Sequence, residues 1–407
     1  MRRVVITGLG LNSPLGNSYN ELLESLKDEK SGIVYIPEWE EIKNLGTKVA
    51  GIVKDVDLKK IPRKYRRSMG RVAQLAAVST TEAISDAGLS EELLSTPRCG
   101  LAFGSTMGGN ETMFEYVPEV KEKMSFRGQN SMAFLKMMSH TVAANLAQMF
   151  GIKGRNIPTC SACTSSAQGI GAGYESVKYG MSDIMICGGS EEHHYLSAGV
   201  FDVMAAASTK HADAPHLSSK PFDESRDGLV VSEGSGAIVL EELEHALARG
   251  AKIYGEIIGY ATSCDGSHIT TPSKEGMSQV MQSSLDDANL NADDIEYINA
   301  HATATARGDI AESHATYSLF GSNTPISSTK GHMGHLLGGC GVVESIICLM
   351  ALRESFLPKT MNFKTLDPDC APINVLGKNT TKNVSIVMNN NFAFGGINTS
   401  LIFKKYQ

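Results

Sequence analysis

Short runs of β-branched and aliphatic residues recur along the chain, and longer segments with helical spacing of apolar positions separate them. From these runs we predict strands at residues 4–7, 100–103, 184–187, 237–240, 253–258, 295–298, 385–388 and 400–403. Strands that alternate with helices in this way indicate an α/β fold.

The order of these elements in the first part of the chain repeats in the second. The strand at 100–103 corresponds to the one at 296–299, and the turn into a helix at 159–163 corresponds to the one at 327–335. In each part a small-residue helix follows, and a strand after a glycine-rich turn closes the unit. The repeat predicts a duplicated fold.

The length of the chain supports two structural units in one body. Its 407 residues exceed the ~250–300 at which a single core usually stops growing. We place the join near residue 250, which divides an N-terminal half of residues 1–250 from a C-terminal half of residues 251–407. Residues 107–140 and 190–230 do not fit the repeat, and we interpret them as loop-rich insertions that shape a pocket or an interface.

Composition and charge exclude several classes of function. A net charge of −7 argues against a broad nucleic-acid surface. The eight cysteines, without a secretory leader, are typical of free thiols in a reducing compartment. Because no segment reaches about 18 uninterrupted apolar residues, we expect no membrane span and a cytoplasmic protein.

Cys163 is the first candidate for chemistry. It lies in the segment from Thr159 to Ser166, between an extended run and a helical pattern. This position is at or near the start of a helix, where the helix dipole and unpaired N–H groups favour the nucleophilic thiolate. Three glycines in the following helix indicate that another backbone or a ligand comes very close.

Cys160 and Cys163 also form a C-x-x-C pair, which leaves other interpretations open. Two small buried thiols are as common as any functional pair. A zinc or redox site is less well supported, because the chain has no second C-x-x-C and its histidines lie far away in sequence. We therefore expect no metal site.

Two histidine segments in the second half extend the candidate site. His301 follows a predicted strand, so its side chain should emerge at the C-terminal end, where open α/β sheets bind ligands. Lys330, His332 and His335 precede another small-residue helix. His332 is open to a purely structural interpretation, whereas histidines and a lysine at matching ends of repeated strands favour a shared site.

The turn at residues 391–398 is the third piece. It places Gly395 and Gly396 beside Phe392 and Phe394. Paired glycines allow backbone N–H groups to approach a reacting carbonyl while an aromatic ring closes the pocket.

With these segments together, the chain resembles the elongating β-ketoacyl-acyl-carrier-protein synthases, and in particular the condensing enzyme II branch of bacterial type II fatty acid synthesis. The resemblance runs from end to end. It is carried by the motifs at residues 4–10, 162–165, 221–228, 299–301, 327–330, 334–338 and 394–396. It implies the thiolase fold, in which two duplicated βαβαβαββ halves form α/β/α/β/α layers, and a homodimer.

The resemblance also implies a mechanism. Cys163 would accept an acyl group from a carrier-protein thioester, and His301 and His335 would stabilise the enolate formed when a malonyl thioester loses carbon dioxide. The backbone N–H groups of Cys163 and Phe394 would form the oxyanion hole. Lys330 would support the site electrostatics, with Glu344 as the acidic residue beneath it.

Further residues are assigned by the same resemblance. Thr303 and Thr305 would bond the amides of a phosphopantetheine arm, and Thr270 would lie near its entrance. Because the acyl carrier protein delivers that arm, no separate cofactor is implied. Met107 and Phe201 would line the acyl tunnel, although ordinary core packing accounts for them equally well.

A basic run is the local exception to the acidic balance of the chain. It includes Arg63, Lys64 and Arg67. Such a run is usually a solvated helix face, but it falls where the resembled family docks its acidic carrier.

Several positions depart from the family pattern. Ala302 and Ala393 stand where glycine is typical, Ile397 where threonine is typical, and the pair Ala306 and Arg307 where proline is common. Since alanine resists positive φ, Ala393 would restrict the gate loop.

Three alternatives to the fatty acid synthase stay open. A specialised polyketide or polyene ketosynthase would use the same chemistry. A non-catalytic chain-length-factor subunit would normally lack the nucleophile, whereas this chain retains Cys163, His301 and His335. A thiolase would require a catalytic cysteine in the C-terminal half.

Overall fold

A single mixed sheet forms the framework of the computed structural model, which describes residues 1–406. Over these residues the sheet has eleven strands in the order β12-β10-β9-β14-β15-β8-β1-β7-β6-β4-β5. Its strands in chain order are β1 (Val4–Asn12), β4 (Cys99–Gly104), β5 (Asn156–Thr159), β6 (Ile184–Glu191), β7 (Gly234–Glu242), β8 (Gly255–Cys264), β9 (Tyr297–Asn299), β10 (Pro325–Ser327), β12 (Asn374–Val375), β14 (Ile386–Ala393) and β15 (Ile397–Lys404). Every strand predicted from the hydrophobic runs overlaps one of these, and three of the predictions, 253–258, 295–298 and 385–388, begin one or two residues before the observed strand.

The two halves of the sheet have the same topology. The order β5-β4-β6-β7-β1 in the first half matches β10-β9-β14-β15-β8 in the second, with parallel pairs at the outer end and antiparallel pairs at the inner end. The halves meet where Val4–Ile6 of β1 pair antiparallel with residues 255–257 of β8. The predicted duplication and α/β fold are confirmed, whereas the domain boundary at residue 250 stays a prediction.

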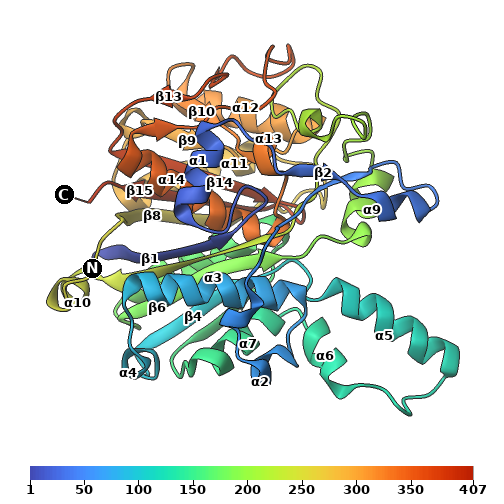
Figure 1. The fold of residues 1–407 in the computed structure, drawn as a ribbon. Helices are drawn as coiled ribbons and strands as arrows, with labels where there is room; N and C mark the ends of the chain where they lie inside the picture. Colours follow the sequence, from blue (N-terminus) through green and yellow to red (C-terminus); the bar gives the residue numbers. More distant parts are fainter. Residues whose placement is uncertain (407) are drawn as a thin grey trace.

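Helices complete five layers around the two half-sheets. The outer layers are α3 (Arg71–Ala87) with α7 (Thr141–Phe150) and α11 (Lys274–Ala288) with α12 (Ala306–Phe320). Between the half-sheets lie α8 (Ser165–Lys178) and α14 (Cys340–Glu354); α8 contacts β6 and β15, and α14 contacts β14 and β7. Figure 1 shows α3 on one side of the central strands and α11 with α14 on the other.

The glycines of α8 have a packing reason. A Cβ added to Gly171 would lie 2.0 Å from the ring of Tyr260 on β8, and one added to Gly173 would lie 2.2 Å from Cys187 Sγ on β6. Glycine costs about 1 kcal/mol in a helix interior, and here it permits the close approach of strands from both halves. The helix that follows Cys163 is thereby fixed between the two sheets.

The segment 107–140 differs from the prediction of a loop-rich insertion. It contains two helices, α5 (Asn110–Lys123) and α6 (Ser131–Met137). Of the α5 side chains only Asn110 is buried, and Pro118 lies inside the helix, where it argues against a helix in the sequence. Residues 190–230 contain α9 (Tyr195–Val203) between irregular stretches, as expected for an insertion.

Shorter elements cover the remaining surface. They are α1 (Tyr19–Lys27), α2 (Arg63–Arg66), α4 (Glu91–Leu94), α10 (Leu243–Ala248) and α13 (Lys330–Met333), with the ribbons β2 (Ile33–Tyr35)–β3 (Val49–Gly51) and β11 (Phe356–Leu357)–β13 (Thr380–Thr381). Within residues 1–406 no helix has the length and apolar character needed to cross a membrane.

Candidate active site

Cys163 lies in a tight turn between β5 and α8. The turn is a 3-10 segment over Ala162–Thr164, and Ala162 adopts a left-handed conformation with φ of 49°. The Cys163 side chain is buried, and its carbonyl accepts a hydrogen bond of 3.2 Å from Cys340 Sγ at the start of α14. This contact fixes the nucleophile candidate against the other central helix.

His335 lies two residues before the matching 3-10 turn of the second half, Leu337–Gly339, which leads into α14. Its backbone N–H donates to Val230 O at 2.7 Å and its carbonyl accepts from Ser232 N at 2.9 Å. Its Nε2 lies 3.0 Å from Cys163 Sγ, which is hydrogen-bond distance for a thiol and an imidazole. The repeated topology therefore brings the starts of α8 and α14 together.

His301 follows the end of β9 and completes the group. Its backbone N–H and that of Ala302 donate to the two oxygens of Glu312 at 2.8 and 2.6 Å. Its ring is 5.3 Å from that of His335 in an edge-to-face arrangement and 6.0 Å from that of Phe392. The sulfur and one nitrogen of each ring all lie within 4.8 Å of one another.

Burial sets the protonation states of this group. It raises the pKa of the Cys163 thiol to about 12, against the expectation that the helix start favours a thiolate. Burial, followed by the positive charge of Lys330, holds the pKa of His301 and His335 well below 6.5. The resting site thus contains a thiol beside a neutral imidazole that can accept its proton.

Lys330 and Glu344 form a buried ion pair beneath the imidazoles. Both side chains are almost fully buried, and Lys330 Nζ donates to Glu344, whose other oxygen accepts from Asn391 Nδ2 at 2.7 Å. Burial alone would lower the pKa of Lys330, but the Glu344 carboxylate raises it, so the ammonium stays charged.

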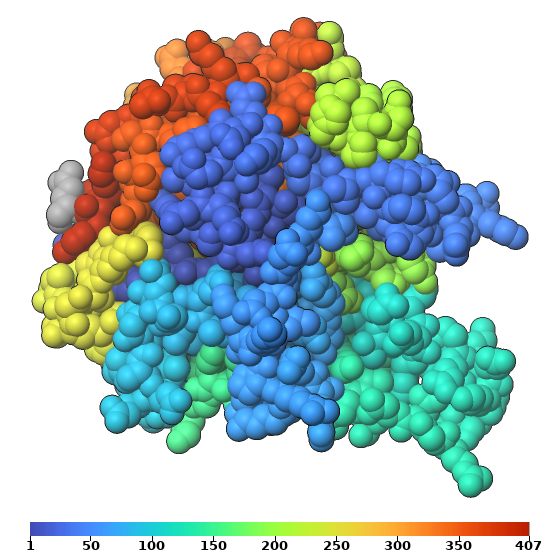
Figure 2. Space-filling view, in the orientation of Figure 1, coloured from blue at the N-terminus to red at the C-terminus, as the bar shows by residue number. Residues whose placement is uncertain are grey.

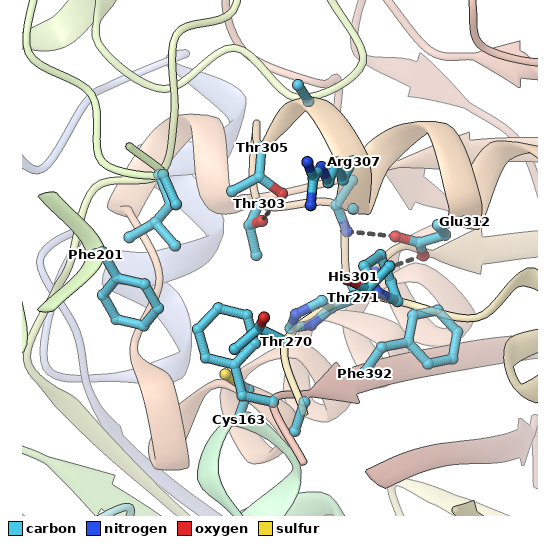
Figure 3. Close-up of a pocket in the computed structure, with 18 of the residues that line it drawn as sticks. Cys163, Phe201, Thr270, Thr271, His301, Thr303, Thr305, Arg307, Glu312 and Phe392 are labelled. Carbon is cyan, nitrogen blue, oxygen red and sulfur yellow. Dashed lines mark hydrogen bonds between the residues drawn. The ribbon is translucent and has the colours of Figure 1, made fainter. Parts of the chain in front are cut away.

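A cavity of about 590 Å³ connects this group to the surface (Figure 3). Thr303 and Thr305 line it, with their hydroxyls 3.1 Å apart. Thr270 lies on the wall as well, and the rings of Phe201 and Phe394 pack 5.6 Å apart. These predicted residues therefore share one space with Cys163.

Other predicted residues lie elsewhere. Met107 is 42% exposed and is not among the residues that line the cavity, so its tunnel role stays a prediction. Arg63, Lys64 and Arg67 are exposed on and beside α2 and also lie outside the cavity lining. His332 is buried between the carbonyls of Lys30 and Lys359, as its structural interpretation requires.

The two cysteines of the C-x-x-C pair have different surroundings. Cys160 is exposed and its thiol donates to Thr106 O at 3.2 Å, whereas Cys163 faces the imidazoles. The donors of Cys163, His301 and His335 are of the type that binds soft cations such as Zn²⁺.

The expected effect of Ala393 on the gate loop is corrected by the backbone. Ala393 ends β14 with an ordinary negative φ, and the left-handed residues of the turn are Gly395 and Gly396, with φ of 91° and 70°. Because the glycines carry the strain, alanine at position 393 fits the strand without penalty.

Sequence reasoning missed several residues of the cavity wall. Glu312 is buried on α12, where burial raises its pKa to about 8. Arg226 is buried and pairs with Asp309 and Asp367, and it donates to Thr305 O at 3.4 Å. The contacts of these side chains join segments distant in sequence. Arg226 lies in the motif at residues 221–228 but had no role assigned to it, and Glu312 lies in an ordinary helical sequence.

A buried thiol with two neutral imidazoles in a duplicated five-layer fold defines an acyl-transferring condensing enzyme of the thiolase fold. Models of the beta-ketoacyl synthase N-terminal and C-terminal domains match residues 1–246 and 254–364. The chain belongs to the beta-ketoacyl synthase family.

Relatives and solved structures agree with this assignment. The 3-oxoacyl-[acyl-carrier-protein] synthase 1 of Haemophilus influenzae is 41% identical and the synthase 2 of Synechocystis 37% identical, each match covering 100% of this chain and 100% and 99% of the relative. A beta-ketoacyl synthase crystal structure from Burkholderia phymatum matches with a TM-score of 0.97 and 42% identity over 100% of both chains. The predicted family is confirmed; because both synthase names occur, the predicted branch II stays a prediction.

Proposed function

We propose that the enzyme extends an acyl chain by two carbons in a decarboxylative Claisen condensation with malonyl-acyl carrier protein. The observation that carries the proposal is the buried group of Cys163, His301 and His335, with Cys163 Sγ 3.0 Å from His335 Nε2. The names of the relatives, which specify 3-oxoacyl-[acyl-carrier-protein] synthases, support the same substrates.

The first half-reaction loads Cys163. The thiol sulfur attacks the thioester carbonyl of the donor while the neutral His335 ring accepts the thiol proton. The C–S bond to the arm then breaks, and the proton passes to the departing arm sulfur. Backbone N–H groups of Cys163 and Phe394 stabilise the tetrahedral oxyanion in this proposal.

The second half-reaction forms the carbon–carbon bond. The malonyl thioester loses carbon dioxide, and the bonding pair moves into an enolate. The enolate oxygen accepts an N–H bond from His301 and one from His335, whose ring has by then shifted its single proton to Nε2. The enolate carbon attacks the thioester on Cys163, the C–S bond to Cys163 breaks, and the sulfur leaves as a thiolate that takes a proton from solvent. Burial and then the Lys330 ammonium lower the pKa of both rings and keep them neutral.

The cavity walls suit an amide-bearing arm and an apolar chain. Thr303 and Thr305 offer hydroxyls to the arm amides, with Thr270 nearer the entrance, and the arm arrives attached to the carrier protein without a separate cofactor. Phe201 and, by prediction, Met107 bound the acyl chain. Arg63, Lys64 and Arg67 offer positive charge to an acidic carrier.

A homodimer is proposed from the surface of the first half. Strand β5 is the edge of the sheet, and the projecting α5–α6 segment carries exposed Phe126 and Phe134, with exposed fractions of 72% and 61% (Figure 2). An unpaired strand edge and exposed aromatic side chains are each typical of an interface, and we propose that a second copy of this chain covers them. Light scattering during gel filtration measures the molar mass in solution, which should be that of two chains.

One assay tests the condensation. The purified enzyme is given hexanoyl-carrier and malonyl-carrier protein, and the products are identified by mass spectrometry. We expect a hexanoyl adduct on Cys163, release of carbon dioxide and a 3-oxo-octanoyl carrier. An enzyme that forms neither the adduct nor carbon dioxide would contradict the proposal.

A further inference from the structure

The cavity continues into a surface groove at the start of α11 and α12. This groove has a volume of about 300 Å³. Its lining consists of Thr271, Pro272, Lys274, Arg307, Ile310, Ala311 and His314, of which Thr271, Pro272 and Arg307 also line the cavity. A ligand that enters the cavity past these shared residues therefore has its outer end in the groove.

Two cations in this groove are free of carboxylate partners. Arg307 and Lys274 are exposed, and neither forms an ion pair within residues 1–406. By contrast Arg226, the other arginine of the cavity wall, is buried and already held by Asp309 and Asp367. Arg307 is thus the guanidinium at the mouth that remains available to an anion.

The carboxylates near the mouth are already occupied by other donors. Asp265 accepts from Asn398 Nδ2 at 2.6 Å, and Asp227 accepts from Ser208 Oγ and from the N–H groups of Thr209 and Lys210. In a chain with a net charge of −7, free cations at a substrate entrance therefore stand out. They point to a substrate with negative charge at that level.

The order of residues along the cavity identifies the charged group. Figure 3 shows Cys163 at one end, Thr270 and His301 above it, then Thr303, and Arg307 beside Thr305 at the opposite end. The thioester of the donor reacts at Cys163, and the amide groups of its arm lie along Thr303 and Thr305. The group that follows the pantetheine portion outward is a phosphate, both on a carrier protein and on coenzyme A.

We propose that Arg307, assisted by Lys274 from the neighbouring helix, is an anion site for the phosphate of the pantetheine arm. The inference rests on the proposed function and deepens it. A planar guanidinium bonds two phosphate oxygens at once, which fixes the register of the arm in the cavity. Arg307 is therefore a positioning residue for the donor rather than a catalytic one.

The test compares donors with and without the phosphate. Loading of Cys163 by hexanoyl-carrier protein, hexanoyl-CoA and hexanoyl-pantetheine is followed by intact-protein mass spectrometry for the native enzyme and Arg307→Val. We expect kcat/KM to fall about 10-fold with both phosphate donors, mainly through KM, and to change less than about 2-fold with hexanoyl-pantetheine. Arg307→Lys should recover part of the loss, and Lys274→Ala should show a smaller loss of the same pattern.

Two controls test whether the loss comes from the charge of Arg307 at the cavity entrance rather than from a general loss of surface charge. Lys378→Ala removes an exposed cation outside the cavity and groove linings and should leave loading by all three donors unchanged. The Arg307→Val loss should also shrink as salt is added, because exposed ion pairs are screened. Thermal unfolding of each variant confirms that the fold is retained.

The outcomes are distinct. An equal loss with all donors, or no loss with either phosphate donor, overturns the anion site. A loss confined to the carrier protein would assign Arg307 to the protein surface and also overturns it, whereas losses with the carrier and coenzyme A assign the shared phosphate. If the native enzyme is loaded by none of the donors, the proposed function fails instead.

Discussion

The two halves share one topology but contribute different chemistry to the active site. At the start of its central helix, the N-terminal half places Cys163, the proposed acceptor of the acyl chain. At the equivalent start in the C-terminal half stands His335, and His301 and Lys330 come from the same half. Duplication therefore supplied the geometry, whereas the residues at the matching turns determine the role of each half.

The most damaging change on the N-terminal side is Cys163→Ala. Removal of the sulfur leaves no acceptor for the acyl group, so chain transfer should fall by about 10⁴-fold or more. Cys160→Ala is the matched control, because Cys160 is exposed and bonds Thr106 O rather than an imidazole. Mass spectrometry should show that Cys160→Ala transfers the acyl group almost as fast as the native enzyme. If Cys160→Ala is inactive and Cys163→Ala is active, the wrong sulfur has been assigned as the nucleophile.

On the C-terminal side, His301→Ala and His335→Ala should each slow decarboxylation of malonyl-carrier protein by about 10²–10³-fold. Each change removes one of two donors to the enolate oxygen. His332→Ala is the matched third histidine, since its ring bonds the carbonyls of Lys30 and Lys359 instead. We expect folded His332→Ala to release labelled carbon dioxide at the native rate. A loss of rate as large as that of His301→Ala or His335→Ala would contradict the separate role assigned to His332.

A smaller effect should follow when the charge beneath the imidazoles is neutralised. Burial and then Lys330 lower the pKa of His301 and His335, so the native enzyme should keep its neutral rings, and its decarboxylation rate, well below pH 6.5. The double change Lys330→Met with Glu344→Gln removes the charge without leaving a lone buried carboxylate. The pKa of both rings then rises, and the acid limb of the pH profile should move to higher pH; an unmoved limb would contradict this role of Lys330.

The smallest effect is expected at the gate turn. Ala393 has an ordinary strand conformation, so Ala393→Gly should change kcat/KM less than about 2-fold and destabilise the fold by about 0.5–1 kcal/mol. Steady-state assays and thermal unfolding check the two values. A large gain in activity would mean that the alanine restrains the turn after all.

Much of the fold could be predicted because its signal is local. Runs such as residues 184–187 and 237–240 are continuously apolar, since their strands are buried on both faces. Helix α5 was missed because Pro118 interrupts its pattern and its apolar side chains, such as Phe114, are only half-buried against the α9 segment. The strand Pro325–Ser327 is too short and too polar to be distinguished from a loop.

Part of the active site could also be predicted from local sequence signals. Cys163, His301 and His335 stand in conspicuous small-residue segments, whereas Glu312 lies in an ordinary helical sequence and becomes notable only when it is buried against the His301 backbone. Burial raises the pKa of the Cys163 thiol and so opposes the expected effect of the helix start, because a helix start is visible in the sequence and the depth of burial is not.

The division of the active site between the halves has a consequence for synthesis of the chain. A ribosome completes Cys163 long before it adds His335, and α14 must still follow to hold that histidine against the sulfur. Under the proposed roles, a chain that ends before His335 has the nucleophile but no proton acceptor, so we expect it to consume no malonyl groups. Activity then requires the C-terminal half to pack against α8.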